Sequence, residues 1–156
     1  MATTTIIYVA MVLAVFAVMS YSAHADDDFI SRTCKKTKNA ELCVDVLHQN
    51  IDSDDASSEL DLANISLKIA SATADLNVEY TKDWVRHSRH KPQRGALVAC
   101  RLAYADAVND LKLRAIPKFH SGDYAGAIKH VLAAKGAADA CENAFKWIKL
   151  EPRQPS

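Results

Sequence analysis

The four cysteines carry the most specific chemistry in this sequence: Cys34, Cys43, Cys100 and Cys141. An even number of cysteines in a secreted chain is typical of a disulfide framework, although sequence alone allows three ways of pairing four of them. None of the four has the C-x-x-C spacing that zinc sites and thioredoxin-like redox sites use. The cysteines therefore predict two structural disulfides rather than a metal site or a redox centre.

Motifs of enzyme chemistry are missing from the sequence. It contains no Gly-x-Ser-x-Gly turn, no His-Glu-x-x-His motif and no glycine-rich phosphate loop. His87 and His90 lie three residues apart, a spacing that a metal site can use, but no carboxylate or cysteine ligand is identifiable near them. Cys–His catalysis is disfavoured because disulfides explain the cysteines. We predict a protein that is not an enzyme and that holds no cofactor and no metal.

The first residues predict a signal peptide over residues 1–25. The unbroken apolar run from Ile6 to Met19 is too short to span a bilayer comfortably. Ala23 and Ala25 fit the small-residue rule for signal peptidase, which places cleavage before residue 26. No later segment is apolar enough to span a membrane, so we expect the mature chain, residues 26–156, to be secreted without a membrane anchor.

Composition favours one helical domain. The 19 basic and 19 acidic residues all follow residue 25, and a balanced surface does not indicate a nucleic-acid partner. Glycine and proline are scarce, with four of each, which favours helices over a β-sandwich or barrel.

Apolar spacing of three and four residues, with turn signals between the periodic segments, predicts an all-α chain. The expected helices cover residues 29–38, 40–50, 59–89, 96–115 and 124–150. In the long helix 59–89 an apolar stripe is expected to face the core: Leu62, Ile65, Ile69, Ala72 and Leu76. The opposite, solvated face is expected to carry Asn64, Lys68, Ser71 and Asp75. Pro92 marks residues 90–95 as a linker, and residues 117–123 read as a turn.

Helical hairpins also predict how the cysteines pair. Residues at equal distance from the turn of an antiparallel hairpin face each other. The midpoint of Cys100 and Cys141 falls inside the turn 117–123, and the midpoint of Cys34 and Cys43 falls beside Asn39, where the first two helices break. We therefore expect the disulfides Cys34–Cys43 and Cys100–Cys141.

Several segments resemble the plant invertase and pectin methylesterase inhibitors. They are the Cys34-x8-Cys43 segment, the stretch from Ala99 to Ala107, the Gly122-Asp123-Tyr124 turn and the stretch from Cys141 to Phe145. The resemblance covers nearly the whole mature chain. It implies an up-and-down helical bundle over residues 52–150, preceded by a helical hairpin over residues 26–51.

Three long helices are counted in this chain, whereas the family resemblance implies four. We therefore expect the last bundle helix to be missing. An apolar stripe meant for a fourth helix would then be uncovered, and such a patch favours self-association.

Pro117-Lys118-Phe119 resembles a motif that, in the invertase-inhibiting branch of the family, enters the sucrose pocket from a bundle hairpin. Retaining glycosidases hold two carboxyl groups roughly 5 Å apart, and a lysine ammonium fits between them. Phe119 would add apolar contact, and Pro117 would stiffen the approach. The resemblance thus implies a secreted inhibitor of acid invertase, in the apoplast and cell wall, with the vacuole as the alternative compartment. An ordinary helix-ending turn is the simpler reading of the same residues.

Two other functions stay open. The target can be pectin methylesterase, which inhibitors of that branch cover with the helix surface of the bundle. A small secreted helical carrier of an apolar ligand is the third reading, since an incomplete bundle could expose a groove.

Two surface features complete the sequence. Asn64-Ile65-Ser66 is an N-glycosylation sequon, with Asn64 on the expected polar face. The densest basic run covers residues 86–91 together with Arg94. This run could touch anionic pectin or an acidic enzyme rim, but a solvated helix end, where cations complement the helix dipole, is the simpler interpretation.

Overall fold

A computed structural model describes residues 28–146 and residue 148 of the 156-residue chain. The predicted signal peptide and the last predicted residues of the final helix lie outside these residues. All regular secondary structure in the described residues is helical, as the sequence predicts. The chain divides into two compact units, one ending at Ile65 and one beginning at Ser66.

The first unit opens with a helical hairpin. Residues 28–34 are helical, and α2 (Ala40–His48) follows. The first helix ends at Cys34 rather than at the predicted Lys38, because the Thr37 hydroxyl and N–H both donate to the Cys34 carbonyl at 2.8 and 2.9 Å. Asn39 caps α2, since its side chain accepts from the N–H of Leu42 at 3.2 Å.

The disulfide Cys34–Cys43 joins the two helices of this hairpin, with 5.5 Å between the Cα atoms. It is the pair expected from the midpoint argument. A short 3₁₀ helix, η1 (Ile51–Ser53), then leads to α3 (Glu59–His87).

Ser58 starts α3 through a reciprocal cap. Its hydroxyl accepts from the N–H of Asp61 at 3.2 Å and donates to the Asp61 carboxylate at 2.7 Å. Ser57 donates to the same carboxylate from its N–H and its hydroxyl. These bonds, led by the Ser58 hydroxyl, lower the pKa of Asp61.

The buried face of α3 differs from the predicted stripe beyond its first turns. Leu62 and Ile65 are buried as expected, but Ala72 is exposed and Leu76 is 56% exposed. Ser71 and Ala74 are buried instead. Both side chains are small, and a periodicity of large apolar residues does not reveal them.

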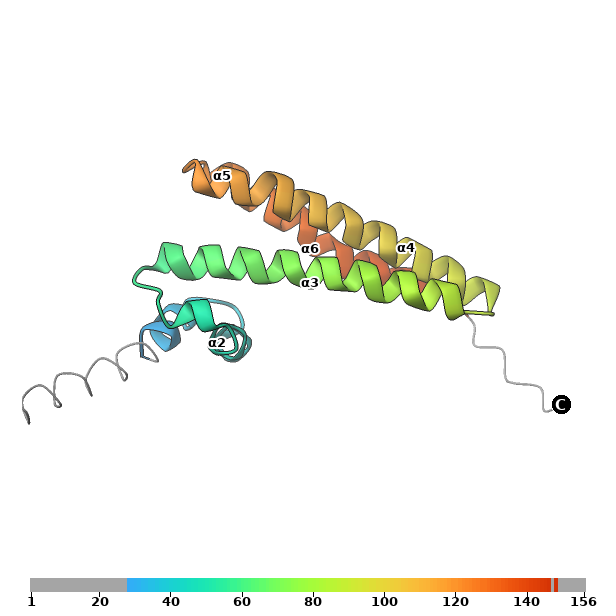
Figure 1. Ribbon diagram of the computed structural model, residues 1–156, viewed down its shortest axis with the longest axis horizontal. Helices are drawn as coiled ribbons and strands as arrows, with labels where there is room; N and C mark the ends of the chain where they lie inside the picture. The colour runs from blue at the N-terminus through green and yellow to red at the C-terminus, as the bar shows by residue number, and fades with distance from the viewer. Residues whose placement is uncertain (1–27, 147, 149–156) are drawn as a thin grey trace, which may run out of the picture. The chain divides into compact units, whose positions relative to one another are not determined.

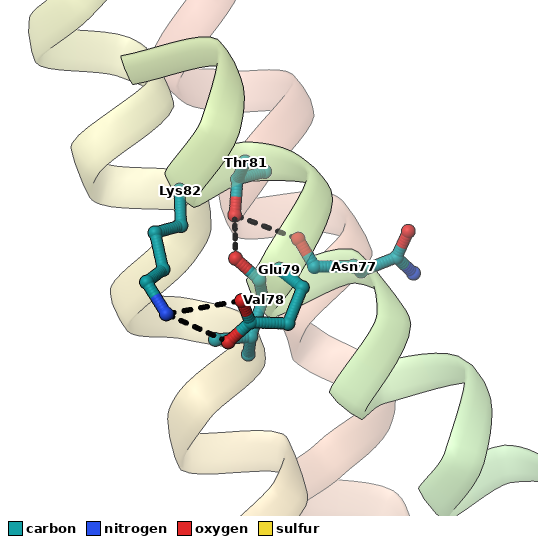
Figure 2. Close-up of polar contacts among 5 residues, drawn as sticks. All are labelled: Asn77, Val78, Glu79, Thr81 and Lys82. Carbon is teal, nitrogen blue, oxygen red and sulfur yellow. Dashed lines mark hydrogen bonds and ion pairs between the residues drawn. The ribbon is translucent and has the colours of Figure 1, made fainter. Parts of the chain in front are cut away.

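The buried hydroxyl of Thr81 on α3 is hydrogen-bonded within the helix. The Thr81 hydroxyl donates to the carbonyls of Asn77 at 2.7 Å and Val78 at 3.0 Å (Figure 2). Lys82 lies on the exposed side of the same turn, where its ammonium bonds both carboxylate oxygens of Glu79 (Figure 2).

The second long rod is continuous from Lys91 to His120. It consists of α4 (Lys91–Val108), the π-helical turn η2 (Asn109–Ala115) and α5 (Ile116–His120). The predicted linker over residues 90–95 was wrong, because Pro92 lies in the first turn of α4, where its missing N–H leaves no hydrogen bond unmade.

α6 (Tyr124–Lys146) runs back along this rod (Figure 1). The disulfide Cys100–Cys141 joins α4 to α6 with 4.3 Å between the Cα atoms, again the expected pair. The core of the second unit gathers small and medium apolar residues from α3, α4, η2 and α6: Leu67, Ala74, Ala107, Leu111, Ala115 and Ala137.

Together these elements form an up-and-down helical bundle in the second unit, the predicted fold class. No helix in the described part of the chain has the length and apolar character needed to cross a membrane.

Candidate functional site

The motif Pro117-Lys118-Phe119 lies in helix α5, not in the turn that the sequence predicts over residues 117–123. Pro117 is the second residue of α5, which continues directly from the π-helical turn η2. The turn itself is shorter and begins at Ser121. The motif is therefore held by helical backbone at the end of the bundle.

A Schellman motif ends α5 directly after these residues. The N–H of Gly122 donates to the Phe119 carbonyl at 3.1 Å, and the N–H of Asp123 donates to the Lys118 carbonyl at 2.9 Å. Gly122 has a φ of 80°, a left-handed conformation in which a Cβ is strained. The sequence Gly122-Asp123 thus fixes a sharp corner between α5 and α6.

Asp123 begins α6 and also neutralises the motif's lysine. Its Oδ1 accepts from the N–H of Gly126 at 2.9 Å, which caps the helix. Its Oδ2 accepts from the Lys118 ammonium at 2.6 Å. The ion pair with Lys118, followed by the bond from Gly126, lowers the pKa of Asp123.

Phe119 contributes to the fold rather than projecting from it. The ring is half-buried, packs against the core of the second unit and meets the Tyr124 ring edge-on at 5.4 Å. Pro117 is exposed, and Lys118 keeps 42% of its side-chain surface accessible. At the corner formed by residues 117–124, Pro117 is therefore exposed and Lys118 partly exposed, while Phe119 packs against the core.

A second carboxylate anchors the bundle behind this corner. Asp110 accepts from Arg114 at 2.8 Å and contacts the ring nitrogen of His130 at 2.9 Å, so it ties η2 to α6. The Arg114 hydrogen bond is the main reason that the pKa of Asp110 is lowered, and His130 lowers it further against the opposing effect of burial. Sequence periodicity gave no signal for the contact between Asp110 and His130, which are twenty residues apart, although Arg114 lies one helical turn after Asp110.

Comparison with known proteins places this arrangement in a family. The family model for plant invertase/pectin methylesterase inhibitors matches residues 28–154. The chain belongs to this family. It is 30% identical over 136 residues to a pectinesterase inhibitor of Actinidia deliciosa, covering 85% of this chain and 71% of that protein.

One further relative and one solved structure also resemble the chain. The chain is 27% identical over 144 residues to pectinesterase inhibitor 2 of Arabidopsis thaliana, covering 92% of this chain and 82% of that protein. A solved structure of a pectin methylesterase inhibitor from Arabidopsis thaliana superposes with a TM-score of 0.56 over 80% of both chains, at 24% identity. That likeness shows the shared fold. The protein is an enzyme inhibitor rather than an enzyme, as the sequence predicts.

The predicted glycosylation residue Asn64 and the histidine His87 both lie in α3, away from the corner residues 117–124 in the sequence. Asn64 is half-buried within helix α3, whereas glycosylated sequons are typical of surface loops. His87 contacts the Asp83 carbonyl and carboxylate. Within the described residues no group of three His, Cys, Asp or Glu side chains could hold a metal ion.

The end of the inhibitor opposite the corner holds a feature that the sequence marked only as a basic run. Trp84 on α3 is 62% exposed, and its indole shares an open groove with the side chains of the α3–α4 turn. An exposed tryptophan two residues before a basic run was the available signal.

Proposed function

We propose that this protein inhibits pectin methylesterase. The observation that carries the proposal is the similarity to two proteins named pectinesterase inhibitors, which extends over 85% and 92% of this chain. Exposed apolar side chains of the bundle are also available for contact with an enzyme. Large apolar side chains are exposed on three of its helical segments, namely Leu76 and Tyr80 on α3, Leu113 on η2, and Ile128 and Leu132 on α6.

Acid invertase is the second candidate target, and the motif Pro117-Lys118-Phe119 favours it. The Lys118 ammonium already bonds a carboxylate, that of Asp123, from a partly exposed position at the end of the bundle. In the complex, the Lys118 ammonium would leave the Asp123 carboxylate and bond the paired carboxyl groups of a retaining glycosidase, so it would still bond carboxyl oxygens. In this mode Phe119 acts as a packed support for the lysine.

Parallel inhibition assays at acid pH separate the two targets. Wild type, Lys118→Ala and the control Lys129→Ala, which removes an exposed lysine of α6, are titrated against a purified pectin methylesterase and a purified acid invertase. We expect all three to inhibit the methylesterase. Loss of invertase inhibition in Lys118→Ala alone would support the second target, and a wild type that leaves the methylesterase fully active would overturn the first.

The protein is proposed to act outside the cell, in the apoplast and cell wall, after removal of the predicted signal peptide. The vacuole is the alternative compartment. Expression of the full chain fused to a fluorescent protein, followed by N-terminal sequencing of the secreted product, tests both the compartment and cleavage before Asp26.

Self-association through the bundle surface is a further proposal, with a second copy of the chain as the partner. Leu76, Tyr80 and Trp84 recur at four-residue steps on α3, and each is more than half exposed. Repeated apolar residues on one helix face are typical of helix–helix contacts. Sedimentation equilibrium of wild type and Tyr80→Lys tests this: a monomeric wild type at all concentrations would contradict it.

A further inference from the structure

The turn between α3 and α4 forms an open groove of roughly 940 Å³. Small-molecule sites have volumes of about 300–1,000 Å³, so the groove can hold several sugar rings or a ligand of similar size. Its lining comes from the end of α3 and the start of α4: Trp84, His87, Ser88, Arg89, His90, Gln93 and Leu97.

Permanent positive charge gathers at the α3–α4 turn, where Arg89 lines the groove, and the Asp83 carboxylate contacts the lining residue His87. Four always-charged cations lie between residues 86 and 94, and no acidic residue interrupts them: Arg86, Arg89, Lys91 and Arg94. All four are exposed, and no carboxylate of the described residues pairs with any of them. Lys82 and Lys118 of the second unit have carboxylate partners, whereas Lys129 and Lys135 of α6 have none among the described residues.

Folding alone does not explain where these cations lie. Arg86 and His87 occupy the last turn of α3, where positive charge complements the helix dipole. Lys91 and Arg94 occupy the first turn of α4, where positive charge opposes the dipole, and that turn has no acidic residue. The cations at the start of α4 are unfavourable for that helix and favourable for an anion bound near its N-terminus.

The groove also has an apolar platform. Trp84 exposes its indole at one side, while Leu97 forms part of the lining and is 2% exposed. Gln93 and Ser88 add uncharged hydrogen-bonding groups beside it. Flat apolar surface flanked by planar polar and charged side chains matches a ligand with alternating ring faces and carboxylates, rather than a small inorganic anion.

We propose that this groove binds unesterified galacturonan, the polyanionic form of pectin. Ring faces of the uronate residues lie on Trp84, and their carboxylates bond Arg89, Arg94 and neighbouring cations as bidentate or point-charge contacts. The choice of this uronate rests on the proposed function, since methylesterase action on pectin produces these carboxylates. Such binding would hold the inhibitor where its target enzyme has been active.

Isothermal titration calorimetry of the full mature chain with an unesterified oligogalacturonate tests the proposal without any enzyme. We expect saturable binding that weakens as salt is added. The double variant Arg89→Ala/Arg94→Ala should bind about tenfold more weakly, because two charge-assisted contacts are lost. Trp84→Ala should weaken binding about fivefold, and Trp84→Phe should restore part of it.

The matched control is Lys129→Ala/Lys135→Ala, which removes two cations from the exposed side of α6 and should bind like wild type. Fully methyl-esterified oligogalacturonate should not bind. Two results would overturn the proposal in favour of non-specific charge attraction. One is a control variant that binds as weakly as Arg89→Ala/Arg94→Ala. The other is dextran sulfate that binds as tightly as the oligogalacturonate and whose affinity does not change in Trp84→Ala. Inhibition of the methylesterase is assayed separately with wild type. If wild type inhibits the methylesterase but does not bind oligogalacturonate, only the proposed ligand of the groove is rejected. If it binds oligogalacturonate but does not inhibit the methylesterase, only the proposed target enzyme is rejected.

Discussion

The two ends of the second unit both carry charged side chains, but they differ in whether those side chains have partners within the protein. At the corner between α5 and α6, every charged group of the turn is used internally: Lys118 bonds Asp123, and Asp123 caps α6. At the turn between α3 and α4, Arg89, Lys91 and Arg94 have no carboxylate partner among the described residues, and Trp84 is exposed. The charged groups of the α5–α6 corner therefore stabilise its conformation, whereas the cations of the α3–α4 turn remain available to a ligand.

This difference changes which end is expected to bind by charge. The motif Pro117-Lys118-Phe119 can engage an enzyme only by giving up the Lys118–Asp123 pair, so its contact is a competition. The cations of the α3–α4 turn give up only water. The comparison predicts that internal substitutions at the corner affect stability, whereas those at the opposite end affect ligand binding.

The largest expected effect comes from the disulfide that ties α4 to α6. Removing it with Cys100→Ser/Cys141→Ser should lower the free energy of unfolding by about 4 kcal/mol on the chain-entropy model, because a long loop is released. The Cys34–Cys43 bridge closes a loop with a sequence separation of 9 instead of 41, so Cys34→Ser/Cys43→Ser should cost about 3 kcal/mol. Denaturant titration of the oxidised proteins measures both, and a smaller loss for the long loop would contradict the ranking.

The next effect tests whether the corner is fixed by backbone. Gly122→Ala should lower the free energy of unfolding by about 1.5 kcal/mol, because alanine is strained at a φ of 80°. Gly136→Ala is the matched control, since Gly136 lies inside α6 with no atom within 4 Å of an added Cβ. That change should raise the free energy of unfolding by about 1 kcal/mol. Two changes of the same sign would refute a special backbone at Gly122.

A smaller effect concerns the carboxylate behind the corner. Asp110→Asn weakens the bonds to Arg114 and His130 and should cost about 1 kcal/mol near neutral pH. The pKa of Asp110 is lowered in the folded state, mainly by Arg114, so its stabilisation is present above the unfolded value of about 3.9 and is lost as pH falls through the lower folded value. The stability difference between wild type and variant should therefore be flat at neutral pH and shrink below about pH 4. A difference that grows on acidification would show that another group is responsible.

Sequence patterns predicted the helices from local spacing, and they predicted the disulfide pairs from the position of each cysteine relative to a hairpin turn. They predicted a turn over residues 117–123, which the structure confines to the residues from Ser121 onward. They missed the rotation of the buried face of α3 toward Ser71 and Ala74, since small residues carry little hydrophobic signal. They also missed that Phe119 is packed and Lys118 paired, because partners such as Tyr124 and Asp123 are defined only once the corner is closed.

The cluster of Asp110, Arg114 and His130 could not be found from spacing, because it joins two helices across twenty residues. Likewise the sequence showed that the basic run is positively charged, but not which side chains lie beside it. Only the fold shows that Trp84 and Leu97 line a groove beside those cations.

The most direct test of the account is a titration of purified pectin methylesterase with the mature wild-type chain, following residual activity and complex formation by size-exclusion chromatography. We expect activity to fall as a complex of the two proteins appears. A methylesterase that stays fully active and elutes alone, while the same preparation of the chain is helical and disulfide-bonded, would contradict the central claim.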